Sequence, residues 1–217
     1  MAKIITSKQA AEMIKPKDRL MIGGFLAVGA PESIIDDLVI KNTQDLHLIV
    51  IASDYENRGI GKLVANKQVS SAQVSHLGTN REIQAQMNSG FINIELVPQG
   101  TLMERVRAAG AGLGGILTQT GLGTLTQEGK PVIESEGKLY ILEKPITADF
   151  ALIRAHKADK LGNLIYAKTA RNSNPIMAMA GKVTIAEVDE IVEVGELSPE
   201  EIVTPGVFVH YLVKKES

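Results

Sequence analysis

The chain has 217 residues, 44% hydrophobic and 22% charged, a composition that excludes a disordered tail, a collagen-like fibre and a coiled coil. Its 23 basic and 25 acidic residues give a formal net charge of −2, so no basic excess is available to attract nucleic acid or an anionic membrane surface. Cysteine is absent, which excludes disulfides, thiolate metal sites and a cysteine nucleophile, and fits a cytoplasmic protein.

The first 110 residues alternate between strand and helix patterns. Helices are predicted at a capping box over Thr6–Gln9, from Pro31 at a first helical position, after Asn80 as the N-cap, and over residues 101–109. Largely apolar runs predict the strands between them, over residues 20–22, 46–52, 72–77 and 92–97. This alternation is typical of a mostly parallel α/β sheet.

The pattern changes near residue 110. Residues 110–123 are dense in glycine and predict an irregular loop of small residues, and a hairpin is predicted around Glu136-Gly137. A short helix is predicted from Asn174 through Ala180. Further strands are predicted over residues 150–154, 164–166, 183–187 and 207–213.

These elements together predict one α/β domain over residues 1–217. Its open, mostly parallel sheet is flanked by helices, and a small β-rich insertion occupies about residues 110–145. The first residues become polar too early for a secretory signal, and no apolar run is long enough to span a bilayer. We therefore expect neither secretion nor a membrane anchor.

The glycine-containing segment Gly23–Gly29 is the first candidate site, because it joins a strand to the next helix. Glycine lets backbone N–H groups approach a ligand closely, and the start of a helix offers free N–H groups to an anion such as a phosphate. Ligands of open α/β sheets bind at this end of the strands. A tight connection without a ligand explains the pattern equally well.

Gly110, Gly112 and Gly115 match the spacing of the dinucleotide-binding fingerprint. A helix is predicted before them and none after them, whereas the fingerprint requires a strand before and a helix after, so we reject a dinucleotide site. The density of glycines instead favours the close approach of a ligand or of another chain.

Other polar residues give weaker indications. Gln99, at the end of a predicted strand, is placed to donate its amide to an oxyanion, although a turn glutamine is the simpler interpretation. The acids near strand ends are each explained as helix-terminal or solvated charges; they are Glu32, Asp54, Glu56 and Glu104. The four histidines lack metal-ligand spacing, so no metal site is expected. The chain therefore contains no complete catalytic set, which suggests that another chain supplies the reactive group.

Six segments, in order along the whole chain, resemble the α subunit of family I coenzyme A transferases. They are GGFLAVGAP (23–31), SHLGTN (75–80), VPQGTLMERVRAAGAGLGG (97–115), DKLGNLIY (159–166), ARNSNP (170–175) and TPG (204–206). Within the family, the chain is most similar to the acetate, or butyrate–acetoacetate, type. The succinyl-CoA:3-ketoacid type is the alternative, but it usually has a longer segment near residues 130–138.

The resemblance implies the family's isomerase-like α/β fold and a transfer of CoA between a short-chain acyl-CoA and a carboxylate. A glutamate of a β subunit is the nucleophile, so no residue of this chain is the nucleophile. Gln99 is expected to border the cleft as an oxyanion donor. The expected CoA-associated loop comprises Gly23, Gly24, Phe25, Leu26, Ala27, Val28 and Gly29. The expected cleft loop comprises Gly110, Gly112, Gly114 and Gly115.

The resemblance also implies partners. The chain is expected to form an α2β2 or α4β4 assembly with the β subunit, and to use the CoA thioester as a substrate, with no permanently bound cofactor. Two other functions remain open from the residues alone: a non-catalytic module that binds CoA or a nucleotide, and a sugar-phosphate isomerase-like enzyme. The isomerase would need its own acid and base within one chain.

Overall fold

The computed structural model describes residues 1–215, which form one nine-stranded sheet, one three-stranded sheet and six α-helices. The strands are β1 (Lys3–Ile5), β2 (Arg19–Ile22), β3 (Leu46–Ala52), β4 (Val69–His76), β5 (Asn93–Leu96), β6 (Ile116–Thr118), β7 (Val132–Ser135), β8 (Lys138–Glu143), β9 (Ala148–Asp159), β10 (Leu164–Ile165), β11 (Gly181–Val192) and β12 (Tyr211–Lys214). The helices are α1 (Ser7–Met13), α2 (Glu32–Lys41), α3 (Gly61–Ala65), α4 (Arg81–Asn88), α5 (Gln99–Gly110) and α6 (Asn174–Ala180), with 3-10 turns η1 (Leu125–Gln127), η2 (Lys168–Arg171) and η3 (Gly206–Phe208).

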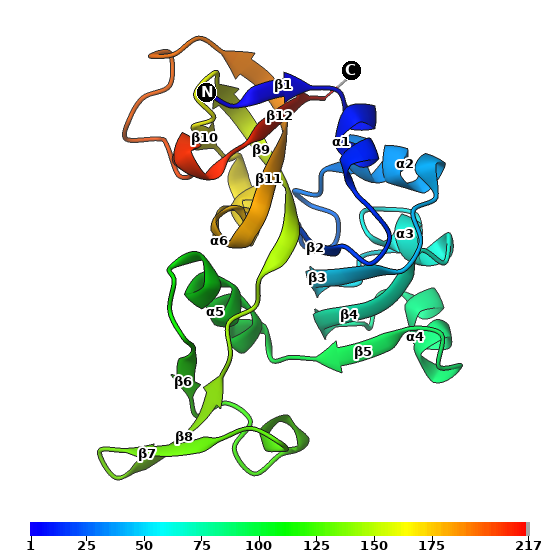
Figure 1. Cartoon of the computed structure of the whole chain (residues 1–217), viewed down its shortest axis with the longest axis vertical. Helices are drawn as coiled ribbons and strands as arrows, with labels where there is room; N and C mark the ends of the chain where they lie inside the picture. Colours follow the sequence, from blue (N-terminus) through cyan, green and yellow to red (C-terminus); the bar gives the residue numbers. More distant parts are fainter. Residues whose placement is uncertain (216–217) are drawn as a thin grey trace.

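The large sheet has the strand order β1-β12-β11-β9-β2-β3-β4-β5, and β10 pairs with β9 (Figure 1). Its pairs are parallel except for the antiparallel β10–β9 pair. The predicted mostly parallel α/β fold is therefore confirmed. Strand order reverses between β2 and β9, and such a reversal is where open α/β sheets bind ligands.

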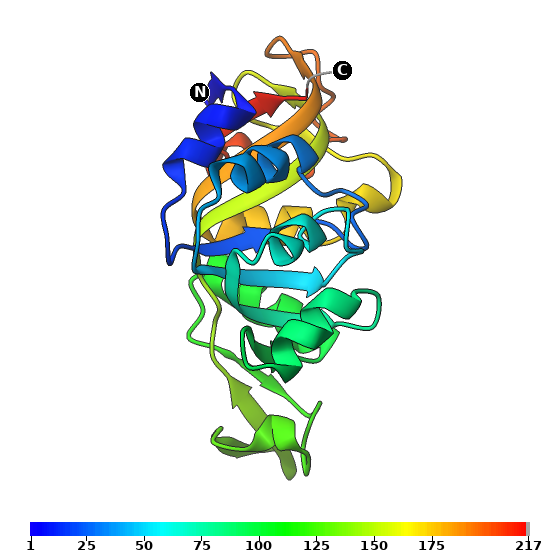
Figure 2. The same cartoon turned by 90° about the vertical axis from the view of Figure 1, so that its right-hand side faces the viewer.

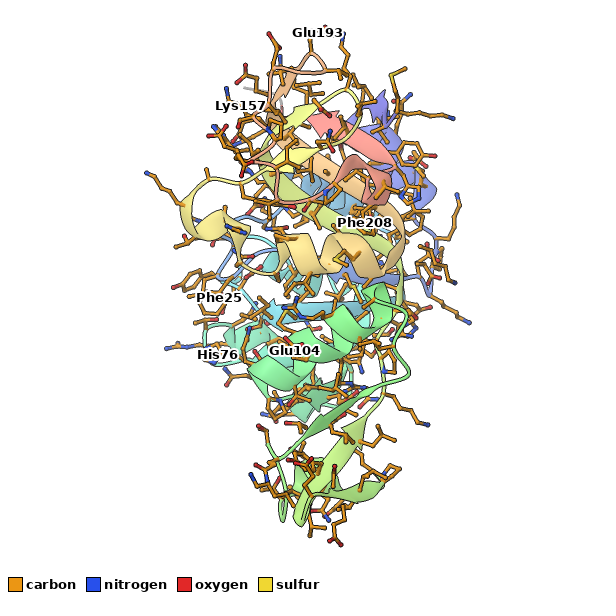
Figure 3. All side chains as sticks on the ribbon, turned by 90° about the vertical axis from the view of Figure 1, so that its left-hand side faces the viewer. Phe25, His76, Glu104, Lys157, Glu193 and Phe208 are labelled. Atoms are coloured by element: carbon orange, nitrogen blue, oxygen red, sulfur yellow. The ribbon has the colours of Figure 1, made fainter. Side chains whose placement is uncertain are left out.

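Strand β3 shows why the sheet needs helices on both faces. Leu48 and Val50 pack with α1 to α4, the layer that faces the viewer in Figure 2. Ile49 and Ile51 point the opposite way and pack with α5 and α6, which face the viewer in Figure 3. Because successive strand residues alternate between faces, a strand covered on both faces is apolar throughout.

Local sequence signals place several helix boundaries. Thr6 and Gln9 form the predicted capping box before α1. The Asn80 side chain accepts a hydrogen bond from the backbone N–H of Ile83 and caps α4, which ends just before Gly90. Pro31 precedes α2 rather than occupying its first position.

Three sequence expectations need correction or addition. The predicted loop over residues 110–123 contains strand β6, which the short apolar segment forms by pairing with β8. The predicted strand over residues 207–213 begins with the 3-10 turn η3, and only Tyr211–Lys214 is a strand, paired with β1 and β11. Strand β1 and helix α3 were not predicted, because they have only three and five residues and no periodic pattern.

The small sheet, with order β6-β8-β7, projects from one end of the molecule (Figure 1). It lies within the predicted insertion, and Glu136-Gly137 forms the turn of its β7–β8 hairpin with positive φ at both residues. Ile141 and Glu143 are its buried residues. Glu143 accepts a 2.6 Å hydrogen bond from Lys130 and lies 3.6 Å from Arg105 of α5. The small sheet is thus tied to α5 and has little core of its own.

Within residues 1–215, no helix combines the length and apolar character that crossing a bilayer requires. The same residues contain no cluster of three or more histidine, aspartate or glutamate side chains placed to hold a metal ion.

Candidate active-site groove

The segment after β2 forms a two-residue turn that projects beyond the sheet. Phe25 and Val28 exchange backbone hydrogen bonds of 3.1 and 3.0 Å, while Leu26 and Ala27 between them have φ of 50° and 65°. Side-chain-bearing residues in this left-handed conformation cost about 1 kcal/mol or more each. We call residues 25–28 the Phe25 turn, and Figure 3 shows Phe25 at the edge of the molecule. Surrounding contacts must hold this strained turn in place.

Asp54, at the end of β3, provides one such contact. Its carboxylate accepts hydrogen bonds from the backbone N–H of Ala27 at 2.9 Å and of Ile60 at 3.0 Å. Burial, together with the nearby charge of Glu32, raises the pKa of Asp54 to about 6 although both N–H groups lower it. The interpretation of Asp54 as a solvated charge is therefore wrong, because the side chain is buried, whereas its bond to Ile60, the N-cap residue of α3, does place it at the start of a helix.

Two asparagines of the ARNSNP segment hold the other side of the turn. The Asn172 amide donates to the Val28 carbonyl at 2.9 Å, and the Asn174 amide donates to the Gly29 carbonyl at 3.1 Å. A Cβ atom at Gly23 would lie 1.8 Å from the Asn174 side-chain oxygen. Glycine is therefore required at Gly23 because Asn174 packs directly against the backbone there.

The start of α2 has no free N–H groups for a ligand. The fully buried Glu187 carboxylate of β11 accepts hydrogen bonds from the backbone N–H of Ser33 at 2.9 Å and of Ile34 at 3.3 Å. Arg154 lies 3.7 Å from the other carboxylate oxygen. The expectation that this helix terminus binds a substrate phosphate is wrong, because an internal carboxylate already occupies it.

A groove of about 1150 Å³ opens beside the Phe25 turn, between that turn, α5 and the segment that contains η2 and the start of α6. We call it the strand-end groove. Its apolar lining residues include Phe25, Leu26, Val28, Ile51, Met103 and Ile176. Arg107, Lys168 and Arg171 add positive charge, and none of the aspartates and glutamates within residues 1–215 lines it. The groove is suited to a ligand with an apolar portion and an anionic portion.

Gln99 begins α5 and lines the strand-end groove. The Ser75 hydroxyl lies 2.5 Å from the Gln99 side-chain oxygen and 2.6 Å from the Ile51 carbonyl, and its single proton serves one of these acceptors at a time. Within residues 1–215, the NH₂ group of the Gln99 side chain makes no hydrogen bond. The role of Gln99 as an oxyanion donor stays a prediction.

The strand-end groove brings together only some of the residues predicted from sequence. Gln99 and three members of the Phe25 turn line it, whereas Gly23, Gly24, Ala27 and Gly29 do not. Gly110, the last residue of α5, lies outside its lining, as do Gly112, Gly114 and Gly115 between α5 and β6. Helix α5 precedes and strand β6 follows these glycines, which agrees with the rejection of a dinucleotide fingerprint.

Comparison with known proteins identifies the family. Residues 4–215 match the family described as coenzyme A transferase. The chain belongs to this family. It is 45% identical over 216 residues to the alpha subunit of acetate CoA-transferase from Escherichia coli K12, covering 99% of this chain and 98% of that protein. It is 44% identical over 214 residues to the acetoacetyl-CoA:acetate/butyrate CoA transferase alpha subunit of Clostridium acetobutylicum, with coverage of 99% and 98%.

Solved structures have the same fold as this coenzyme A transferase chain. A thioester complex of an acyl-CoA transferase from Escherichia coli O157:H7 superposes with a TM-score of 0.87 at 23% identity. The match covers 100% of this chain and 48% of that one, so this chain spans about half the length of that enzyme. Glutaconate coenzyme A-transferase from Acidaminococcus fermentans has a TM-score of 0.84 at 21% identity, with coverage of 98% and 75%.

Sequence reasoning missed several residues that shape the groove of this coenzyme A transferase. Asp54 and Glu187 act across 27 and 154 residues of sequence, and no local pattern indicates such contacts. Asn172 and Asn174 belong to a segment that carried the family resemblance, but its contact with the Phe25 turn could not be derived from spacing. Arg171 belongs to the same segment and Lys168 lies two residues before it, but the sequence did not indicate that either residue lines a groove.

Proposed function

We propose that this chain is the α subunit of a CoA-transferase that moves CoA between a short-chain acyl-CoA and a free carboxylate. One observation carries the proposal: the strand-end groove of a coenzyme A transferase chain has apolar walls and basic residues but no carboxylate among residues 1–215. Such a groove can bind and orient an acyl-CoA, yet it lacks the carboxylate nucleophile that the family's reaction requires.

In this proposal the thioester carbonyl is attacked by a glutamate of the β subunit. The thioester C–S bond breaks, leaving an acyl–glutamyl anhydride and CoA thiolate. The thiolate then attacks the glutamyl carbonyl, giving a glutamyl-CoA thioester and the free carboxylate of the first acid. A second carboxylate reverses these steps. Dividing a difficult exchange into covalent steps lets a weak nucleophile act, and no ATP is needed because one thioester replaces another.

We assign three roles to residues of this chain. The Gln99 amide donates to the oxyanion that forms on the thioester carbonyl through its NH₂ group, which makes no hydrogen bond within residues 1–215. The Phe25 turn packs against the pantetheine portion of CoA, with Gly23, Gly24 and Gly29 allowing the sharp path of the backbone. Lys168 and Arg171 bind CoA phosphates, which supersedes the start of α2 as the expected phosphate site.

We assign a short acyl chain to the substrate. This chain covers 98% of the acetate- and butyrate-type relatives, whereas it covers 94% of the corresponding subunit of the succinyl-CoA:3-ketoacid coenzyme A transferase of Helicobacter pylori J99. A difference in length near residues 130–138 distinguishes the two types, and here Glu136-Gly137 makes a tight two-residue turn. The succinyl type is the second candidate, because that relative is also 45% identical.

The test uses the chain purified with its β subunit, compared with the chain alone. The complex should transfer CoA from acetoacetyl-CoA to acetate or butyrate faster than from succinyl-CoA to acetoacetate, and the chain alone should be inactive. Full activity of the lone chain, or a covalent CoA adduct on it, would exclude the division of labour. CoA binding by an inactive complex would instead favour a binding module. An α2β2 or α4β4 assembly in the cytoplasm, with no resident cofactor, completes the proposal.

A further inference from the structure

The strand-end groove has a nearly buried floor and an open rim. Two of its apolar lining residues form the floor: Ile51 is 4% exposed and Met103 is 9% exposed. The other apolar residues that line the groove, those of the Phe25 turn included, are half-buried or exposed. Lys168 and Arg171 are exposed, so their positive charge lies at the rim. A ligand therefore meets a charged opening and an apolar floor.

A CoA thioester has two ends that match this division. Its phosphates carry charge that is costly to bury, whereas its acyl group is apolar and gains from burial. When the proposed contacts with Lys168 and Arg171 hold the phosphates at the rim, the acyl group is the part that reaches the floor. Each CH₂ group that becomes buried there should raise the affinity roughly fourfold. The floor is thus the part of the groove that can distinguish acyl groups by their length.

Helix α5 places Met103 one turn from Gln99. Gln99, Met103 and Arg107 line the groove at intervals of four residues, which puts them on the same face of the helix. Four residues advance a helix by about 6 Å along its axis. The Ser75 hydroxyl lies 2.5 Å from the Gln99 side-chain oxygen and 2.6 Å from the Ile51 carbonyl, so Ile51 also borders Gln99. A thioester carbonyl bound at Gln99 is therefore adjacent to both floor residues.

Beneath the floor, the protein interior is packed. Ile51 and Met103 belong to the hydrophobic cluster between the large sheet and helices α5 and α6, which face the viewer in Figure 3. Other members of this cluster are fully buried, among them Leu102 and Val106 of α5 and Met177 of α6. Because protein interiors are close-packed, an acyl chain cannot extend past the floor unless a floor side chain becomes smaller.

The two floor residues meet different parts of the acyl group. Ile51, connected to Gln99 through Ser75, flanks the carbonyl carbon. Met103, one turn farther along α5, lies where a short acyl chain ends. Its unbranched side chain can adapt to an acetyl or a butyryl group, but its atoms occupy the space that a longer chain needs. We infer that Met103 sets the longest acyl group that this transferase accepts. The inference rests on the proposed function, to which it adds the residue that selects short chains.

The test uses the α–β complex with acetoacetyl-CoA as the common donor and acetate, butyrate or hexanoate as the acceptor. Each acceptor takes up CoA and becomes the acyl group in the groove, so its kcat/KM reports how well that chain fits. Met103→Ala removes the end of the side chain. It should raise the ratio of kcat/KM for hexanoate to that for butyrate roughly tenfold or more, as expected for two additional buried CH₂ groups. Met103→Phe, which is stiffer and bulkier, should lower the ratio for butyrate to acetate roughly threefold or more.

Met177→Ala is the matched control. Met177 belongs to the same hydrophobic cluster and is fully buried, but it does not line the groove. Its variant should have a lower melting temperature and an unchanged ratio of hexanoate to butyrate. If Met103→Ala folds poorly, Met103→Leu decides the question, because leucine nearly keeps the volume of the side chain and is one atom shorter. That variant should raise the same ratio roughly fourfold.

The outcomes separate the inference from the proposed function. If the unmodified complex transfers no CoA to any of these acids, the proposed function fails. If it is active and the Met103 variants leave the ratios unchanged, the limit on acyl length lies elsewhere in the complex and only the inference is overturned. An equal rise of the hexanoate ratio in the Met177 variant would also overturn the inference, because a general loosening of the core would then explain the change.

Discussion

The carboxylate of Asp54 holds the backbone N–H of Ala27 at 2.9 Å and thereby fixes the strained turn that forms one wall of the strand-end groove. The contact joins the loops that follow two adjacent strands, β2 and β3. Asp54 is 4% exposed, so its negative charge is held away from water in order to keep this turn in place.

Asp54→Asn should alter how stability depends on pH. Because the pKa of Asp54 is about 6 in the folded chain against an ordinary 3.8, the folded chain binds this proton more tightly than the unfolded chain does. The contribution of Asp54 to stability is thus highest at low pH and falls by about 3 kcal/mol as the pH rises through this interval. The variant should therefore gain stability relative to the unmodified chain between pH of about 4 and about 7.

Urea unfolding at both ends of this pH range measures the effect. Loss of one acceptor in the asparagine variant adds an offset that does not change with pH. Glu56→Gln, an exposed acid two residues away, is the control and should show no such trend. If the difference in the free energy of unfolding between the Asp54 variant and the unmodified chain were the same at all pH values, the prediction would be contradicted.

Glu187 should be essential for anchoring α2 to β11. Glu187→Ala removes the acceptor for the N–H groups of Ser33 and Ile34, and it takes a negative charge from beside Arg154. We expect a loss of about 2–4 kcal/mol in the free energy of unfolding. Glu187→Gln keeps one acceptor and should lose less than half as much. Equal losses in the two variants, measured by urea denaturation, would show that the side-chain acceptor is unimportant.

Gln99→Ala should lower kcat by roughly 100- to 1000-fold with little change in KM, as expected for the loss of one oxyanion donor. Ser75→Ala should cause a smaller decrease, because the Gln99 amide remains but is free to rotate. Steady-state kinetics of the α–β complex provide the measurement. A decrease of only a few-fold in the Gln99 variant would return this residue to a structural role.

Lys168 and Arg171 should determine the affinity for CoA thioesters. Replacing either by alanine should raise KM for the acyl-CoA roughly tenfold, and the dependence of KM on salt should become weaker. KM for acetate should change little, since acetate has no phosphate. Lys8→Ala on α1, far along the chain from the strand-end groove, is a control of the same charge. If the Lys8 and Lys168 variants raised KM for the acyl-CoA equally, the net charge of the chain, and not the position of Lys168, would determine the affinity.

Elements defined by neighbouring residues were predictable from the sequence. The Thr6–Gln9 capping box, the Asn80 cap and the Glu136-Gly137 turn each depend on contacts within a few residues, and all three are present. Strand β3 was predictable to the residue because burial on both faces makes it almost continuously apolar, with His47 as the exception.

The contacts that hold the walls of the strand-end groove in place were not predictable in this way. The N–H groups at the start of α2 are occupied by Glu187, a residue of β11 that lies 154 positions from Ser33. The sequence around Gly29 does not indicate this contact. The same applies to Asp54, whose burial follows from the packing of the Phe25 turn over it. Gln99 was predicted because it lies at the end of a predicted strand, where open α/β sheets place their ligands, and it lines the strand-end groove in the structure.

The sparse core of the β6-β8-β7 sheet has a consequence for how readily it unfolds. Three short strands with Ile141 and Glu143 as their buried residues are marginal in water by themselves. These strands are therefore expected to open more readily than the large sheet, and local opening would expose them to proteases and to aggregation.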